Sequence, residues 1–309
     1  MMITDSQGAN MRKSAIAVAI AALSSTSVLA ADMAVKAPPD PAPTVWNWSG
    51  LYVGAGGSLN WTHFDQSLQG VSGTVDVFNG PLLVAQGQEG GPFFDFDRNK
   101  SGFAPDVQVG YAVPFAGGDW LAGLKFTYKY ANADSKENVS IPQTGTGVLL
   151  VPPPPITGPI TGFVQISPAE INLKHQFALI ATVGRKFGDF TLYAGAGPAL
   201  FGVETNFINA IPFAVSGGLT FPAGAPLTVS NNNWVWGGAA QVGTTYSFGG
   251  GWFLDIAYTY AQSASFSIEN SVFVSNQTGT VTIGGPAVLN AQERVTNQSV
   301  MLTLNFRFH

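Results

Sequence analysis

Glycine-rich stretches are the first places in this sequence where residue type and spacing could serve chemistry. Residues 54–57 read Gly-Ala-Gly-Gly, a pattern that can cradle a phosphate when a helix follows it. A dinucleotide fingerprint also needs glycine at its sixth position, which here is Leu59, and Trp61 follows with no helix signal. Gly195-Ala196-Gly197 fails in the same way, because its sixth position is Leu200. We therefore expect no phosphate loop.

Acidic residues from position 95 onward have a spacing that resembles a calcium loop. Asp95, Asp97 and Asn99 stand at the first, third and fifth places, and Asp106 stands at the twelfth. The sixth place holds Lys100 where glycine is required, and the twelfth holds Asp rather than Glu. We interpret the segment as a solvated acidic loop that enters a strand, and expect no bound metal.

The histidines are His63, His175 and His309. No nucleophile motif accompanies them for a histidine base to activate, and no paired carboxylates are present for acid–base catalysis. The sequence therefore predicts no enzyme and no cofactor. Haem binding by His63 or by Tyr130 stays open as an alternative.

The composition favours a chain whose surface is not entirely in water. Charged residues make up 10% of the sequence, against 46% hydrophobic and 12% aromatic residues. A soluble domain carries about 25% charge. The 37 glycines and 20 prolines disfavour long helices. Without cysteine there are no disulfides or thiolate metal sites. A formal charge of −5 with no basic stripe argues against a nucleic-acid partner.

The N-terminal residues have the features of an export signal. Arg12 and Lys13 form a basic region, residues 14–23 are apolar, and Val28-Leu29-Ala30 offers small residues for cleavage. We predict a signal peptide over residues 1–30, with Met11 as the true start. Residues 31–47 are proline-rich and are predicted to be a periplasmic linker, followed by the folded domain over residues 48–309.

Alternation of apolar with small or polar residues recurs through the rest of the chain. Strands of a membrane-spanning barrel alternate in this way over about 10 residues, with the apolar parity toward lipid. An open sheet edge cannot lie in lipid, so the sheet must close. The sequence predicts an all-β fold, an eight-stranded antiparallel up-and-down transmembrane barrel. Its strands are expected at Leu51–Trp61, Phe103–Phe115, Trp120–Tyr130, Leu173–Phe187, Phe190–Phe201, Trp234–Phe248, Trp252–Ala261 and Val300–Phe308.

The connections between these segments predict the orientation of the barrel. Three are tight and glycine-rich, at residues 117–118, 188–189 and 249–251, and the other four are long. Short periplasmic turns and long extracellular loops with aromatic girdles are the layout of outer-membrane barrels. Apolar runs around Gly, Pro or Asn in the long loops predict hairpins that continue the strands above the membrane. The expected periplasmic girdle is Phe115, Trp120, Phe187, Phe190, Phe248, Trp252 and Phe308.

Charged residues on the inward parity are predicted to pair inside the barrel. If Phe115 faces Trp120 across the first turn, the register places Asp106 opposite Lys129. Asp255 and Arg307 lie near the periplasmic ends of the seventh and eighth strands, and we predict a second pair there. Because an eight-stranded barrel is just wide enough for side chains to fill, these pairs are expected to be structural.

Motifs at the two ends of the chain resemble an alphaproteobacterial family of outer-membrane β-barrels, OmpA-like and of the porin-family surface-antigen type. These are Ala30-Ala31-Asp32, the Lys36–Pro39 linker, the strand start Trp48–Gly54 and the aromatic terminus Leu304–Phe308. Two positions depart from the family pattern, since His309 follows the final Phe308 and Lys125 stands where an acidic residue is common. The resemblance implies an abundant surface antigen that stabilises the envelope, with haem binding in some relatives.

We therefore expect a structural surface protein of the cell outer membrane. Its expected partners are outer-membrane lipid and lipopolysaccharide, the barrel-assembly machinery through the C-terminal strand, and other copies through the loops. A small passive porin stays open as an alternative. So does a lipid-modifying enzyme, because His175 falls on the lipid-facing parity near the outer rim.

Overall fold

The computed structural model describes residues 49–91, 94–216 and 219–308. The chain separates into two compact units, Met1–Val45 and Trp46–His309, and every described residue belongs to the second. The signal peptide, nearly all of the linker and His309 lie outside the described residues. Among the residues that are described, no helix is long and apolar enough to cross a membrane.

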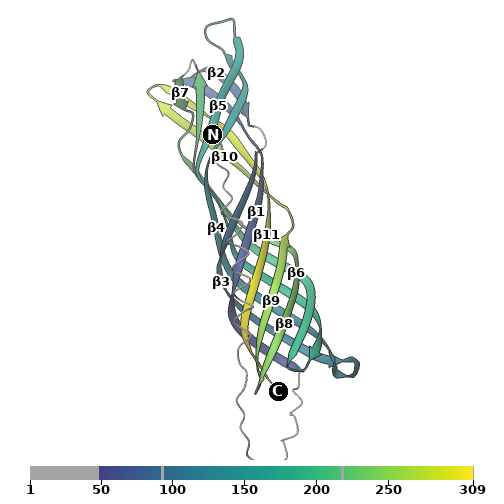
Figure 1. The fold of residues 1–309 in the computed structure, drawn as a ribbon. Coiled ribbons are helices and arrows are strands. Elements are labelled where there is room, and N and C mark those ends of the chain that lie inside the picture. The colour runs from purple at the N-terminus through teal and green to yellow at the C-terminus, as the bar shows by residue number, and fades with distance from the viewer. Residues whose placement is uncertain (1–48, 92–93, 217–218, 309) are drawn as a thin grey trace, which may run out of the picture. The chain divides into compact units, whose positions relative to one another are not determined.

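Eight antiparallel strands close into a ring, so the predicted fold class is confirmed (Figure 1). Each strand pairs with the next, and the last pairs with the first to close the barrel. The ring strands are β1 (Gly50–Asn79), β3 (Phe94–Phe115), β4 (Trp120–Leu149), β5 (Ile156–Phe187), β6 (Phe190–Ser216), β8 (Leu227–Gly249), β9 (Trp252–Ser263) and β11 (Val281–Arg307).

Alternation along each strand sorts the side chains into a lipid-facing belt and an interior. On β1, Leu51, Val53, Leu59 and Trp61 are exposed, while Tyr52 and the inward residues beyond it face the lumen. The same alternation runs through the lower halves of the other ring strands, where the exposed positions are apolar. A sheet with apolar side chains on its outer face and polar ones inside is stable only where hydrocarbon surrounds it.

The ring strands are longer than the sequence predicted, because they continue well beyond the apolar belt. β5 has 32 residues and β1 has 30, whereas about 9–11 residues span the hydrocarbon. Above Trp61 the outward positions of β1 become polar, at His63 and Asp65. The predicted upper limits of the strands are therefore wrong, because hydrogen-bonded pairing persists where the lipid-facing pattern has ended.

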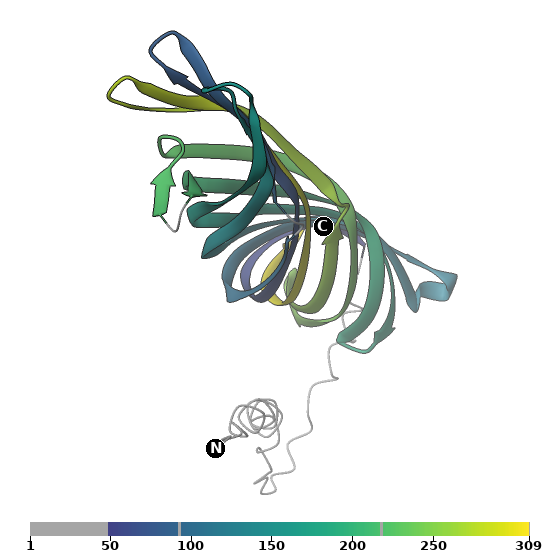
Figure 2. The same cartoon turned by 90° about the horizontal axis from the view of Figure 1, so that it is seen from above.

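The predicted hairpins in the long loops are present and extend the barrel outward. Strand β2 (Leu82–Gly90) pairs with β1, β7 (Leu219–Pro222) with β6, and β10 (Phe266–Thr278) with β11. Figure 1 shows these elements at the end of the unit away from the C-terminus. The β1–β2 and β10–β11 hairpins lie side by side, because β1 and β11 stay paired up to Asn79 and Val281 (Figure 2).

The turns at the opposite end are short. Gly188-Asp189 joins β5 to β6 and Gly250-Gly251 joins β8 to β9. The first turn has four residues and includes the 3-10 helix η1 (Ala116–Gly118), yet Phe115 pairs with Trp120 as predicted. Positive φ angles at the turn glycines explain why glycine is needed there.

The interior above the membrane is mostly apolar, with a buried polar layer formed by Gln66, Arg98, Thr205 and Glu293. One buried cluster includes Phe64, Leu173 and Phe201, and a second one includes Ile141 and Phe207. Polar side chains therefore fill the lower part of the barrel, and mainly apolar clusters fill the part above it. A cavity of about 440 Å³ remains further out, among Val75, Ala85, Ile160 and Ala214.

Candidate functional site: the filled lumen

Lys129 on β4 lies at the middle of the polar interior. It pairs in register with Asp106 on β3, and its Nζ lies 3.9 Å from Asp106 Oδ1. The same Nζ donates to Asn60 Oδ1 at 2.7 Å and to Ser299 Oγ at 2.6 Å. Both ions are buried. The two neutral acceptors and the carboxylate together offset the cost of removing the ammonium from water.

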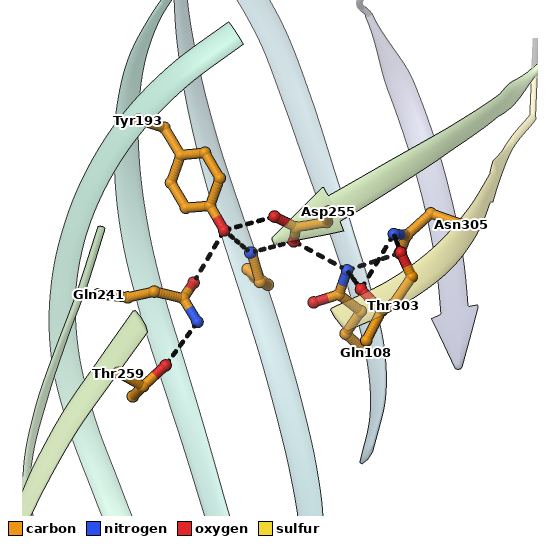
Figure 3. Close-up of polar contacts among 8 residues, drawn as sticks. Gln108, Tyr193, Gln241, Asp255, Thr259, Thr303 and Asn305 are labelled. Atoms are coloured by element: carbon orange, nitrogen blue, oxygen red, sulfur yellow. Dashed lines mark hydrogen bonds and ion pairs between the residues drawn. The ribbon is translucent and has the colours of Figure 1, made fainter. Parts of the chain in front are cut away.

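A second, tighter ion pair lies nearer the periplasmic turns. Lys125 Nζ is 2.8 Å from Asp255 Oδ2 and donates to the hydroxyl of Tyr193, also at 2.8 Å. That hydroxyl donates to Asp255 Oδ1 at 2.7 Å, so both carboxylate oxygens are engaged (Figure 3). Three strands that are not all neighbours, β4, β6 and β9, supply these groups and are linked across the lumen.

Amide side chains extend this network around the ring (Figure 3). Gln108 Nε2 donates to Asp255 Oδ2 at 3.1 Å and to Asn305 Oδ1 at 2.6 Å. Gln241 Nε2 donates to Thr259 Oγ1 at 2.9 Å. All of these side chains are buried, and their hydrogen bonds offset the cost of removing them from water.

The predicted pair between Asp255 and Arg307 is wrong, because Asp255 takes Lys125 instead. Asp255 lies opposite Thr303 on β11. Arg307 is four residues further along that strand, so its Cα lies roughly 13 Å from the Cα of Thr303. The Arg307 guanidinium lies over the ring of Phe253, 5.0 Å from its centroid. Alternation along the Trp120–Tyr130 segment places Lys125 on the inward side, but no local signal joins it to a partner on a strand that is not adjacent.

Open space within the polar interior is small. A cavity of about 50 Å³ lies at its periplasmic end, between Tyr52, Lys125, Tyr193 and Arg307. That volume holds a few water molecules and no larger solute. The lower lumen is therefore closed by its own side chains.

Above the apolar belt, Glu293 on β11 is buried among neutral donors and was not found from the sequence. It is 1% exposed and accepts hydrogen bonds from Gln66 at 2.5 Å and from Thr205 at 2.8 Å. Burial raises the pKa of Glu293 to about 7, with these hydrogen bonds and the charge of Arg98 opposing the shift.

Arg98 on β3 crosses the same layer of the barrel. Its Nη1 donates to the carbonyl oxygen of Ala169 at 3.1 Å, and its Nε lies 3.3 Å from Glu137 Oε2. Burial lowers the pKa of Arg98, and the carboxylates of Glu137 and Glu293 act against that change. Inward parity is the signal that could have placed both Arg98 and Glu293 inside the barrel.

The seven aromatic residues expected in the periplasmic girdle are all exposed beside the short turns. Phe115 and Trp120 face each other across the first turn, with centroids 6.5 Å apart. Phe306, which the sequence interpretation left out of the girdle, packs 5.1 Å from Trp252. Aromatic rings at this level suit the boundary between hydrocarbon and headgroups.

The other residues that could have served chemistry lie apart from one another. His63 contacts Asn99 at 3.0 Å on the outside of the barrel, and His175 contacts the hydroxyl of Tyr128 at 3.0 Å. The suspected calcium segment is part of strand β3, not a compact loop. Within the described residues, no three His, Asp or Glu side chains are grouped to hold a metal ion.

Comparison with known proteins gives a relative by sequence. No family model matches the chain. The chain is similar to Outer membrane protein P1 of Coxiella burnetii, with 25% identity over 214 residues, which cover 67% of this chain and 69% of that protein.

Solved structures with some similarity have low TM-scores. Neisserial surface protein A matches with a TM-score of 0.30 and 11% identity, over 81% of this chain and 97% of its own. The outer membrane protease OmpT of Escherichia coli gives 0.27 and 10%, over 83% and 97%. Ail, the attachment invasion locus protein of Yersinia pestis, gives 0.23 and 12%, over 77% and 98%.

The assignment rests on the barrel itself together with the sequence relative. The ring is closed, its outer surface is an apolar belt edged by aromatic residues, and its lumen is filled. The relative that matches over two thirds of the chain is an outer membrane protein. This chain is a β-barrel protein of the cell outer membrane.

Proposed function

We propose that this barrel is a structural and surface-contact protein that does not conduct solutes. The observation that supports this is the filled lumen below the outer hairpins: buried ion pairs and amides cross its lower part, and apolar clusters with the Glu293 layer fill the part above. A stable, filled barrel of this kind contributes to envelope integrity by its presence in the membrane, without any transport or catalysis. The assignment to an alphaproteobacterial, OmpA-like family is part of the same proposal.

The outer hairpins are the part of the protein that we propose for surface contacts. They carry exposed apolar side chains, Leu82 and Ile156 near the tips and Phe273 in the middle of β10, the last of which is 71% exposed. Exposed apolar groups at the ends of hairpins favour contact with another surface, and loop-mediated self-association is one such contact.

We also propose that the C-terminal strand is the segment that the assembly machinery engages. Its outward residues Leu304 and Phe308 are exposed on the lipid-facing side at the periplasmic end of β11. No catalytic role belongs to this proposal. His175→Ala is expected to leave the lipid A profile of the outer membrane unchanged by mass spectrometry, and a changed profile would support the enzyme alternative.

Single-channel recording in planar lipid bilayers tests the central proposal. The refolded protein is expected to insert without discrete conductance steps, while a general porin added to the same bilayer gives them. Steps in the wild-type recording would support the passive porin instead. A deletion strain with no increase in detergent sensitivity would argue against the role in envelope integrity.

A further inference from the structure

The lipid-facing side of β6 carries a groove with an apolar floor. Outward residues Pro198 and Leu200 form the floor, Phe177 on β5 forms one wall, and Trp236 on β8 forms the other. The groove has a volume of about 420 Å³. Trp236 is 66% exposed, so its ring stands out from the barrel as the rim of the groove.

A polar cavity of about 210 Å³ lies next along β6, toward the outer side of the membrane. It lies among Lys174, His175, Glu204, Asn232, Asn233 and Trp234. Lys174 and Glu204 form an ion pair. The register of β5 and β6 shifts between Leu173 and His175, and this bulge turns Lys174 and His175 outward together.

Trp234 joins the two parts. Its ring packs over Gly202, where an added Cβ would lie 2.9 Å from the ring. The ring stacks on His175 with centroids 5.9 Å apart, and it lies 5.8 Å from Phe177, a wall of the lower groove. Gly202, Leu200 and Pro198 follow one another at outward positions of β6, so the combined groove runs roughly 13 Å along the strand.

The polar part must supply any selectivity of this groove. Lipid tails are as apolar as the groove. An acyl chain that moves from the bilayer into the groove therefore gains packing contacts but no hydrophobic free energy. Trp234 is 57% exposed, and the face of an indole carries negative charge density, which suits the C–H face of a sugar ring. The Asn232 amide and the Lys174–Glu204 pair offer donors and acceptors beside it for hydroxyl or phosphate groups.

We propose that this groove is a binding site for a glycolipid of the outer leaflet. Its sugar headgroup lies against Trp234 in the polar cavity, and one acyl chain follows Leu200 and Pro198 into the membrane. An ordinary phospholipid has no sugar ring to place on the indole. This inference goes beyond the proposed function, because it holds whether or not the lumen conducts.

Native mass spectrometry of the delipidated, refolded barrel tests the site, with lipid A as the probe and phosphatidylethanolamine for comparison. Trp234→Ala removes the platform for the headgroup. Gly238→Phe fills the lower groove, since Gly238 pairs with Pro198 and an added Cβ there meets nothing nearer than 4.0 Å. Trp61→Ala is the matched control, because Trp61 is exposed in the belt on β1, four strands away around the ring.

Wild type and Trp61→Ala are expected to retain one lipid A per barrel, and the two groove variants to lose at least tenfold in retention. Each variant is first shown to be folded by its heat-modifiable mobility on gels. Equal retention by Trp234→Ala and wild type would overturn the proposal. So would equal losses in Trp61→Ala and Trp234→Ala, or equal retention of phosphatidylethanolamine, because each of these describes unspecific lipid around the barrel.

Discussion

A single ion pair, Lys125 with Asp255, holds together side chains from distant strands of the barrel. Lys125→Met removes the cation and leaves a buried carboxylate uncompensated, so the barrel is expected to lose about 3–5 kcal/mol in free energy of unfolding. Urea unfolding in lipid vesicles measures this loss. Lys100→Met is the control, because Lys100 is exposed on β3. A loss no greater than that of the control would show that the pair is energetically neutral.

Glu293 makes the outer part of the barrel sensitive to pH. Its pKa of about 7 in the folded protein exceeds the ordinary value of 4.5, so the folded state holds the proton more tightly than the unfolded state. The stabilisation is complete below pH 4.5 and falls as pH rises toward 7, by up to about 3 kcal/mol.

Urea unfolding from pH 4.5 to pH 8 measures that decline, and Glu293→Gln is expected to remove it. Glu269→Gln serves as the control, because Glu269 lies exposed on β10. If the decline survives in Glu293→Gln, another group is responsible for the pH dependence.

Register explains which residue contacts could be predicted from the sequence. Asp106 and Lys129 lie on adjacent strands joined by a short turn, so counting back from Phe115 and Trp120 places them opposite each other. Lys125 and Asp255 meet across the lumen from strands that are not adjacent, and so do Glu293 and Thr205. Contacts of that kind depend on the tilt and diameter of the barrel, which alternation alone does not determine.

At the scale of elements, the glycine-rich start of β1 is needed for close packing at the point where the ring closes. A Cβ on Gly56 would overlap the backbone carbonyl oxygen of Leu302 on β11. Because backbone atoms cannot move aside cheaply, Gly56→Ala is expected to destabilise the barrel by about 1–3 kcal/mol.

Urea unfolding and heat-modifiable mobility of the refolded variant measure this effect. Gly102→Ala is the matched control, since an added Cβ at Gly102 meets no atom within 4 Å. Equal stability of the two variants would mean that β1 and β11 can move apart to admit the added methyl group without a loss in free energy of unfolding.

The strand segments were predictable because lipid imposes a strict alternation on them. The upper halves of the same strands were not, since no hydrocarbon surrounds them and their outward residues are polar, as at Asp65 and Lys136. Those halves are held by backbone pairing and by inner clusters around Ile141 and Phe207, a pattern that the sequence shows only weakly.

At the scale of the whole molecule, two clusters of buried apolar side chains both contact Phe266. The buried cluster around Phe201 lies nearer the polar lumen, and the cluster around Phe207 lies further out on the same strand. Replacing residues 144–161 by an Asn-Gly turn would cut the β4–β5 hairpin where Gln143 pairs with Gly162.

The shortened barrel is expected to keep its heat-modifiable mobility and to lose no more than about 1 kcal/mol in free energy of unfolding, because distant changes rarely couple. Gel mobility and urea unfolding against the full-length protein measure both. A shortened chain that does not fold would show that the extension and the membrane part form one cooperative unit.

The pairing of β1 with β11 has a kinetic consequence for how the protein is made. Tyr52 meets Arg307, so the first strand finds its partner only when nearly the entire polypeptide is available. Contacts this far apart in sequence make folding slow, and until they form, both edges of the nascent sheet stay open to pairing with other chains. The polypeptide must therefore reach the membrane unfolded, with its unpaired strands protected from aggregation until the barrel closes.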